Sequence, residues 1–277
     1  MVSSDQRRRQ LAREKFLRQQ QRREAARRRA RRRTAAIAAG VVAVVAFGAG
    51  AWATNGFGSG DHDNTAGSEP SAPPTSKAPD PCDKPAKGDV ADLSFKKEPA
   101  LTIDKSATYT MTLETTCGSM PITMDASKAP HTVNSFNFLV GKHFFDHTRC
   151  HRLTTLGIYV LQCGDPKGNG TGGPGYTIPD ENLKDKRLKG DVYPAGTVAM
   201  ANQYNPQTKE GKNSGGSQFF LVFQDSKLPP YYTPFGTLSK DGMKVLKKIA
   251  KAGESTGQGD GAPNATVVIN KATIRKS

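Results

Sequence analysis

The chain has 277 residues and a formal net charge of +15, but the positive charge is concentrated at one end. Residues 1–33 contain thirteen arginines and one lysine against three acidic residues, so +11 of the net charge lies there. Because the rest of the chain is close to neutral, the overall basicity does not identify a nucleic-acid-binding protein. Once this tail and the segments after it are removed, about 180 residues remain, which is enough for one domain with its own core.

The basic tail, residues 1–33, is rich in Arg, Gln, Glu and Ala and has few helix-breaking residues. Its few apolar side chains, Leu11, Phe16 and Leu17, cannot form a core face. We expect a cytoplasmic helix held at an anionic membrane surface, because an apolar segment follows directly. A solvated charged helix and an RNA-binding segment are the alternatives.

Residues 34–53 are predicted to form a single transmembrane helix. The nineteen residues from Ala35 to Ala53 are all uncharged, a length that at about 1.5 Å per residue matches the hydrocarbon core of a bilayer. Arg31 to Arg33 precede this segment, and the positive-inside rule then places the N-terminus in the cytoplasm and the rest of the chain outside the cell membrane. The alternative is a cleaved signal peptide, since Ala51-Trp52-Ala53 resembles a cleavage site.

Residues 54–92 are rich in Pro, Gly and Ser and poor in apolar side chains. Such a composition cannot bury enough surface to offset the entropy of ordering, so we expect a disordered linker. The folded domain is then predicted to occupy residues 93–277.

The pattern of residues within 93–277 predicts short strands and two helices. Residues 109–114 and 120–124 alternate in polarity around a short turn and indicate a β-hairpin. Helices are expected over residues 129–140, with Pro130 in the first turn, and over residues 241–250. The other expected strands cover residues 150–154, 159–163, 197–201, 218–223, 266–270 and 272–274. Many short strands with two separate helices favour a closed antiparallel barrel with a helix at each end.

Several motifs in this domain match, in order, those of a known family. They are Pro130-His131-Thr132-Val133-Asn134-Ser135-Phe136, Phe144-Phe145-Asp146, His151-Arg152, Gln162-x-Gly164-Asp165, Gly170-Thr171-Gly172-Gly173, Asp180-Glu181-Asn182, Val198-Ala199-Met200-Ala201-Asn202, Gly216-Ser217-Gln218-Phe219-Phe220 and Phe235-Gly236. On these motifs the sequence resembles the cyclophilins, the cyclosporin-binding class of peptidyl-prolyl cis-trans isomerases, over about residues 107–273. With its basic tail and single apolar segment, it resembles the membrane-anchored cyclophilin-type proteins of actinobacteria. The resemblance implies a mainly β fold, a closed antiparallel eight-stranded barrel with two capping helices, here preceded by the transmembrane helix.

The resemblance also implies a site. The family's catalytic arginine matches Arg152. The substrate-binding residues of the family match Tyr159, Val160, Gln162, Ala201, Asn202, Gln218, Phe220, Leu228 and Tyr232. Val160 replaces a methionine of the family, and Tyr232 replaces a histidine. No Trp is present near Lys227, where cyclosporin-sensitive members have one, so we expect weak cyclosporin binding at most.

The chemistry of these residue types agrees with that implication. Carboxylate pairs, nucleophile motifs, phosphate loops and metal-ligand clusters are missing from the sequence, and we expect neither a metal nor another cofactor. A fixed guanidinium beside an apolar pocket suits a reaction in which no covalent bond forms, such as rotation about a prolyl peptide bond. We expect an enzyme that helps proteins outside the cytoplasm to fold, with proline-containing polypeptides as substrates and no nucleic-acid partner. The alternatives are a peptide-binding chaperone module with weak turnover and a protein that acts on nucleic acid or membranes through its tail.

The four cysteines, Cys82, Cys117, Cys150 and Cys163, have no Cys-x-x-Cys spacing, which disfavours zinc and thioredoxin-like sites. If Arg152 and Gln162 are cross-strand neighbours, Cys150 and Cys163 are close enough for a disulfide, and a location outside the cytoplasm would allow it. Two buried free thiols are the alternative. Cys82 and Cys117 could form a second bridge, although no geometric argument supports that pair.

Overall fold

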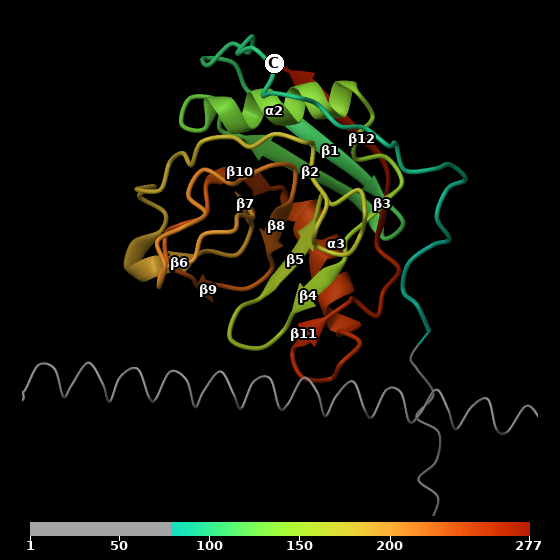
Figure 1. Cartoon of the computed structure of the whole chain (residues 1–277). Coiled ribbons are helices and arrows are strands. Elements are labelled where there is room, and N and C mark those ends of the chain that lie inside the picture. Colours follow the sequence, from blue (N-terminus) through green and yellow to red (C-terminus); the bar gives the residue numbers. More distant parts are fainter. Residues whose placement is uncertain (1–78) are drawn as a thin grey trace, which may run out of the picture. The chain divides into compact units, whose positions relative to one another are not determined.

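The computed structural model describes residues 79–277, drawn in colour in Figure 1. The predicted tail 1–33, the predicted transmembrane segment 34–53 and most of the predicted linker 54–92 lie outside the described residues. Within residues 79–277, none of the helices has the length and apolar character needed to cross a membrane. The membrane-spanning part of the predicted fold class therefore has no counterpart in the part of the chain that the structure describes.

Ten strands form one antiparallel sheet, and two more form a small separate ribbon. The order across the large sheet is β11-β4-β5-β8-β7-β10-β2-β1-β12-β3. Its strands are β1 (Tyr109–Thr115), β2 (Gly118–Met124), β3 (Thr148–Arg149), β4 (Arg152–Thr154), β5 (Val160–Cys163), β7 (Thr197–Met200), β8 (Phe219–Val222), β10 (Pro234–Leu238), β11 (Asp260–Gly261) and β12 (Val268–Lys276). The ribbon pairs β6 (Val192–Tyr193) with β9 (Ser226–Lys227) and follows a short 3-10 turn, η1 (Lys189–Asp191).

The large sheet is open, so the prediction of a closed eight-stranded barrel is wrong. A closed barrel needs its first and last strands to exchange hydrogen bonds, but β11 and β3, at the two ends of the order, are not paired with each other. Each of these edge strands has only two residues, too few to leave an alternating pattern in the sequence. Within residues 79–277, the mainly β architecture with two α-helices is present (Figure 1).

The β1–β2 hairpin supplies much of the core, because every second residue points inward. Met111 and Leu113 of β1, with Met120 and Ile122 of β2, are fully buried. The register places Met111 opposite Ile122 and Leu113 opposite Met120, so these side chains are direct cross-strand neighbours. The predicted hairpin thus has one face toward the core.

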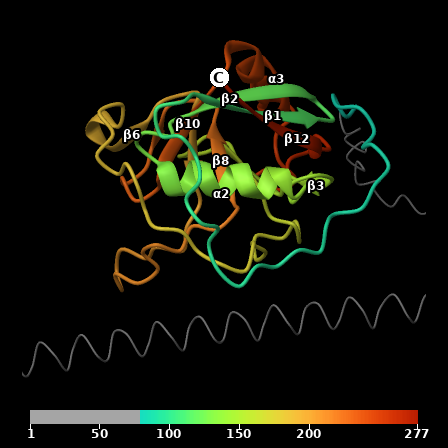
Figure 2. The same ribbon diagram turned by 90° about the horizontal axis from the view of Figure 1, so that it is seen from above.

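The two helices pack on the sheet at different places (Figures 1 and 2). Helix α2 (Pro130–Gly141) has proline in its first turn, where no intrahelical N–H is lost, and it buries Phe136 against Phe145 and Phe235. Helix α3 (Lys240–Lys251) begins at Ser239, whose hydroxyl accepts a hydrogen bond from the N–H of Gly242 at 3.0 Å. Both helices stabilise the sheet from which the candidate site is built.

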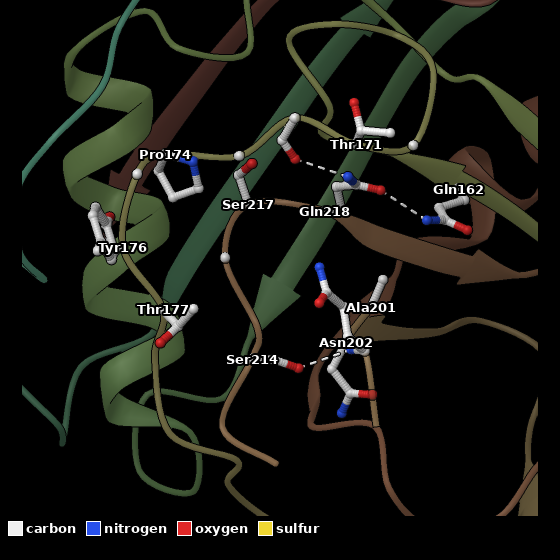
Figure 3. Close-up of a pocket in the computed structure, with 16 residues that line it drawn as sticks. Gln162, Thr171, Pro174, Tyr176, Thr177, Ala201, Asn202, Ser214, Ser217 and Gln218 are labelled. Carbon is white, nitrogen blue, oxygen red and sulfur yellow. Dashed lines mark hydrogen bonds between the residues drawn. The ribbon is translucent and has the colours of Figure 1, made fainter. Parts of the chain in front are cut away.

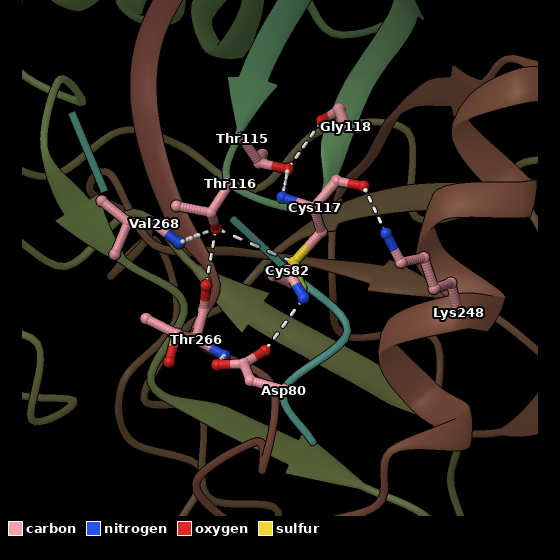
Figure 4. The surroundings of a disulfide bond; sticks show 9 residues. All are labelled: Asp80, Cys82, Thr115, Thr116, Cys117, Gly118, Lys248, Thr266 and Val268. Carbon is pink, nitrogen blue, oxygen red and sulfur yellow. Dashed lines mark hydrogen bonds between the residues drawn. A yellow bond between two sulfur atoms is a disulfide. The ribbon is translucent and has the colours of Figure 1, made fainter. Parts of the chain in front are cut away.

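An extended N-terminal arm, residues 79–108, precedes β1 and is fastened to the domain by a disulfide. Cys82 is bonded to Cys117 in the β1–β2 turn (Figure 4). The Asp80 carboxylate accepts hydrogen bonds from the N–H groups of Cys82 and Thr266, at 3.0 and 2.9 Å. The predicted domain boundary at residue 93 therefore falls inside a segment that already contacts the sheet.

Farther along, the arm crosses helix α2 (Figure 2). The Asn134 side-chain amide donates hydrogen bonds to two carbonyl groups of the arm, and Phe95 packs edge-on against Phe138 with ring centroids 4.9 Å apart. The Phe95 N–H donates to the carbonyl of Pro174 at 2.8 Å. The arm thus contacts both α2 and the loop that contains Pro174.

Candidate active site

Three adjacent strands align an arginine, a glutamine and a phenylalanine in one row. Arg152 of β4 is opposite Gln162 of β5, and Gln162 is opposite Phe220 of β8. Directly opposite residues in an antiparallel sheet project to the same face, so the three side chains share one surface. The row continues to β7, where Phe220 is opposite Ala199.

A cavity of about 180 Å³ opens on this surface. It is lined by Arg152, Ile158, Val160, Gln162, Ala201, Asn202, Phe220, Leu228 and Tyr232. Eight of the ten residues predicted to form the site thus surround one cavity. Gln218 and Tyr159 do not line it.

The apolar side of this cavity belongs to a small hydrophobic cluster that is separate from the main core. Phe220 packs edge-on against Tyr232, with ring centroids 5.5 Å apart, and tilted against Tyr193 at 6.2 Å. The Tyr193 hydroxyl donates to the Tyr232 carbonyl at 2.8 Å, and burial raises the pKa of Tyr193. Tyr193 was not among the predicted site residues. It supports the cavity wall through its contacts with Phe220 and Tyr232.

Ile158, rather than Tyr159, is the cavity residue of the β4–β5 loop. Side chains along an extended segment alternate between faces, so Ile158 shares a face with Val160 and Gln162. Tyr159 instead packs edge-on against Phe223, with ring centroids 5.8 Å apart. The period-two pattern of the sequence contained the signal for Ile158, whereas the match to the family's motifs pointed to Tyr159.

The Arg152 guanidinium is held on two sides. Its Nε and Nη2 each donate to a carboxylate oxygen of Asp260, both at 2.7 Å. Its Nη1 donates to Oε1 of Gln162 at the longer distance of 3.4 Å. The hydrogen bonds that Arg152 donates to Asp260 are the main cause of the raised pKa of Arg152, and the same hydrogen bonds lower the pKa of Asp260. The sequence analysis did not identify Asp260, which is 108 residues away from Arg152.

A chain of side-chain amides continues from Gln162. Its Nε2 donates to Oε1 of Gln218 at 2.9 Å, and Nε2 of Gln218 donates to the carbonyl of Gly172 at 2.8 Å. Gln218 therefore lies one hydrogen bond away from the cavity residues. Figure 3 shows Gln162 and Gln218 joined in this way at the edge of a second cavity of about 350 Å³. This second cavity is lined by Gln162, residues 170–177, residues 201–203, Ser214 and residues 216–218.

A disulfide closes the hairpin that contains Arg152 and Gln162. Cys150 and Cys163 are bonded, with their Cα atoms 4.0 Å apart. Between Cys150 and Arg152, His151 donates its backbone N–H to the carbonyl of Gln162 at 3.1 Å. Its ring nitrogens have no hydrogen-bond partner among the described residues, and desolvation lowers the pKa of its imidazole. The two strands that position Arg152 are thus linked both covalently and by hydrogen bonds.

Comparison with known proteins identifies relatives of this domain. The profile of the family described as "Cyclophilin type peptidyl-prolyl cis-trans isomerase/CLD" matches residues 110–274. A Mycobacterium leprae protein named "probable peptidyl-prolyl cis-trans isomerase B" is 44% identical over 209 residues, which cover 72% of this chain and 68% of that protein. The protein of the same name from Mycobacterium tuberculosis is 45% identical over 176 residues, which cover 61% of this chain and 55% of the relative.

A solved structure gives the same assignment. The crystal structure of a Cryptosporidium parvum cyclophilin type peptidyl-prolyl cis-trans isomerase aligns with a TM-score of 0.50 and 25% sequence identity. The alignment covers 61% of this chain and 99% of that one. The resemblance seen in the sequence motifs is therefore confirmed by an independent match to the family and to mycobacterial relatives.

Proposed function

The chain belongs to the cyclophilin-type peptidyl-prolyl cis-trans isomerases, and from this membership we propose that it accelerates rotation about X–Pro bonds in proteins outside the cytoplasm, with Arg152 stabilising the twisted amide. The family fixes the reaction class, which is isomerisation. The role of Arg152 and the place of action are our inferences. One observation supports the mechanism above all others, namely a guanidinium fixed at the rim of an apolar cavity.

Amide resonance determines what a site must do to accelerate rotation about a peptide bond. Rotation about the peptide bond has a barrier of about 18–20 kcal/mol, because the C–N bond loses its partial double-bond character. In the twisted state the proline nitrogen has a free lone pair that can accept a hydrogen bond. A donor that reaches this lone pair stabilises the twisted state more than the planar state, which is the requirement for catalysis.

Arg152 has the donors for this task. A guanidinium has five N–H groups and stays charged at any physiological pH. Three of them bond to Asp260 and Gln162, which leaves two N–H groups on Nη1 and Nη2 for a substrate. The group is already oriented before substrate arrives, so little reorganisation is needed in the transition state.

The cavity beside Arg152 suits a proline ring. Val160, Phe220 and Leu228 form apolar walls, and the ring can leave water there without losing hydrogen bonds. The peptide group of Asn202 makes no hydrogen bond within residues 79–277, while its side chain is fixed by the carbonyl of Tyr231 at 2.6 Å. We infer that the backbone of an extended substrate pairs with this free peptide group.

The test of the mechanism is Arg152→Ala in the full chain. Because loss of one donor that stabilises the transition state costs about 3–4 kcal/mol, kcat/KM for an Ala-Pro peptide should fall by two orders of magnitude or more. Exchange spectroscopy by NMR measures the cis/trans rate without a coupled protease. Arg275→Ala, which removes an exposed arginine of β12, is the matched control and should keep full activity.

Wild-type-like turnover in a folded Arg152→Ala protein would exclude the mechanism. If the unmodified chain binds proline peptides but does not change their rate of isomerisation, the chaperone alternative replaces the enzyme.

Two disulfides support a location outside the cytoplasm. All four cysteines of the chain are paired, Cys82 with Cys117 and Cys150 with Cys163. Such bonds form and persist in oxidising compartments, whereas cytoplasmic thiols are kept reduced. Denaturing lysis of the source cells in the presence of an alkylating reagent should therefore leave all four cysteines unmodified, as read by intact mass. Alkylation of all four would contradict this location.

A further inference from the structure

The edge of the sheet contributes a carboxylate to the site. Strand β11 pairs with β4, with Asp260 opposite Thr154 and Gly261 opposite Leu153. From this position Asp260 reaches back to Arg152 and accepts two hydrogen bonds of 2.7 Å from Nε and Nη2. Two parallel N–H···O bonds fix both the place and the plane of a guanidinium.

The Arg152–Asp260 ion pair is expected to contribute little to the free energy of unfolding. The side chains of Arg152 and Asp260 are 41% and 54% exposed. Exposed ion pairs contribute little to the free energy of unfolding, because water already solvates both charges well. A bidentate contact at such a place is better explained by the orientation that it imposes on Arg152.

The contact also leaves the catalytic side of the arginine free. Asp260 lies on the strand beyond β4, on the side away from β5, and it does not line the proline cavity. It occupies the Nε and Nη2 edge of the guanidinium, while Nη1 points to Gln162, which does line the cavity. Asp260 therefore holds Arg152 without taking the place of a substrate.

The loop before Asp260 is organised around a second carboxylate. Glu254 is buried, and its two oxygens accept hydrogen bonds from the N–H and hydroxyl of Thr256, at 2.6 and 2.7 Å, and from the N–H of Gly259 at 2.8 Å. The carbonyl of Gly259 in turn accepts a hydrogen bond from the N–H of Thr155, the residue that follows β4. The loop is thus anchored to the strand that contains Arg152.

Two glycines are required for this arrangement. Gly259 has φ +89°, and a Cβ there would lie 2.4 Å from the Cβ of Leu156. A Cβ on Gly261 would lie 2.4 Å from a carboxylate oxygen of Glu254. Asp260 thus lies between two glycines that have no side chain to clash with their neighbours. Gly259 lies close to Leu156 of the β4–β5 loop, and Gly261 lies close to Glu254.

We propose that Asp260 is a positioning residue for the isomerisation, which fixes the Arg152 guanidinium through its Nε and Nη2 edge so that the remaining N–H groups face the substrate amide. The proposal rests on the proposed function, because it gives Arg152 the catalytic role. It predicts that the effect of Asp260 on the rate acts through Arg152 and through nothing else.

The test is a double-mutant cycle in the full chain, with Asp260→Asn, Arg152→Ala and the pair combined. Loss of one charge-assisted contact should lower kcat/KM of Asp260→Asn about tenfold, mainly through kcat, with the peptide dissociation constant nearly unchanged. In the Arg152→Ala background the same substitution should cause no further loss. Asp241→Asn is the matched control, since Asp241 is an exposed aspartate that bonds to Lys244 at 2.8 Å on α3, and it should have no effect.

A spectroscopic measurement keeps the proposal testable if the asparagine variant is unstable. The Nε–Hε resonance of Arg152, assigned by its loss in Arg152→Ala, should report a restrained group in the unmodified protein and exchange faster with water in Asp260→Asn. Asp260→Glu retains a carboxylate and should recover part of the rate lost in Asp260→Asn.

Full activity of Asp260→Asn beside an inactive Arg152→Ala would overturn the positioning role and leave the proposed function intact. Equal losses from Asp260→Asn in both backgrounds, or a faster Asp260→Asn enzyme, would overturn it as well. An active Arg152→Ala enzyme would instead refute the proposed mechanism itself.

Discussion

At the scale of single residues, two adjacent phenylalanines of β8 point to opposite faces of the sheet. Phe219 is fully buried in the main core, where its ring lies 5.5 Å from that of Phe136 and 6.5 Å from that of Phe235. Phe220 projects to the other face and forms a wall of the cavity beside Arg152. The alternation of a strand thus places one ring of the dipeptide in the core and the other at the cavity.

Replacing each phenylalanine by leucine should show which ring affects stability alone and which also affects turnover. We expect Phe219→Leu and Phe220→Leu each to lower the free energy of unfolding by about 1–3 kcal/mol, because both rings are packed. Only Phe220→Leu should lower kcat/KM, by about tenfold, since a pocket that fits its ligand less well loses about 1–3 kcal/mol. Denaturant titration and NMR exchange rates, measured on the same samples, decide this. Equal loss of turnover per folded molecule in both variants would contradict the assignment.

The site residues also differ in how far the sequence could predict them. Arg152, Gln162 and Phe220 stand in motifs that resemble those of a family, and their grouping around one cavity followed from that resemblance. Asp260 and Tyr193 have no such motif, and their contacts with Arg152 and Tyr232 join segments that are far apart in the chain. Only the folded sheet brings these partners together.

At the scale of elements, the predictions succeeded where a pattern was long enough to be recognised. The β1–β2 hairpin alternates over seven residues in each strand, and α2 and α3 each have twelve residues with a periodic apolar face. The edge strands β3 and β11 have two residues each and no detectable period. Because β3 and β11 are not paired with each other, the sheet is open. Local sequence patterns could not predict whether these two strands pair.

The extra element at the edge has a functional consequence. A sheet that ended at β4 would leave Arg152 on an edge strand, with support from Gln162 alone. Strand β11 covers that edge and brings Asp260 into contact with the guanidinium. The open architecture and the position of Arg152 are therefore connected through one short strand.

At the scale of the whole molecule, the domain extends beyond the region that the family profile matches. The profile begins at residue 110, whereas the arm of residues 79–108 already packs against α2 and the turn after β1. The Cys82–Cys117 bond fastens this arm to the β1–β2 turn, and neither of its cysteines lies on β4 or β5. The Cys150–Cys163 bond, in contrast, closes the hairpin of Arg152 itself.

Removing each disulfide should therefore affect stability and activity differently. The bond between Cys82 and Cys117 spans 35 residues and the bond between Cys150 and Cys163 spans 13. Loop-closure entropy then predicts losses of about 4 and about 3 kcal/mol in the free energy of unfolding when both cysteines of a pair are replaced by alanine. Guanidinium titrations of the full chain, followed by far-ultraviolet circular dichroism, measure these losses.

The turnover of the two double variants should diverge. We expect Cys82→Ala with Cys117→Ala to keep the kcat/KM of the unmodified protein at temperatures where it is folded, because neither cysteine lines the cavity beside Arg152. Cys150→Ala with Cys163→Ala should lose turnover as well as stability, since the strands that hold Arg152 opposite Gln162 are then free to separate. Loss of turnover in the first variant while folded would show that the arm acts on the site from a distance, and unchanged turnover in the second would show that hydrogen bonds alone suffice to position Arg152.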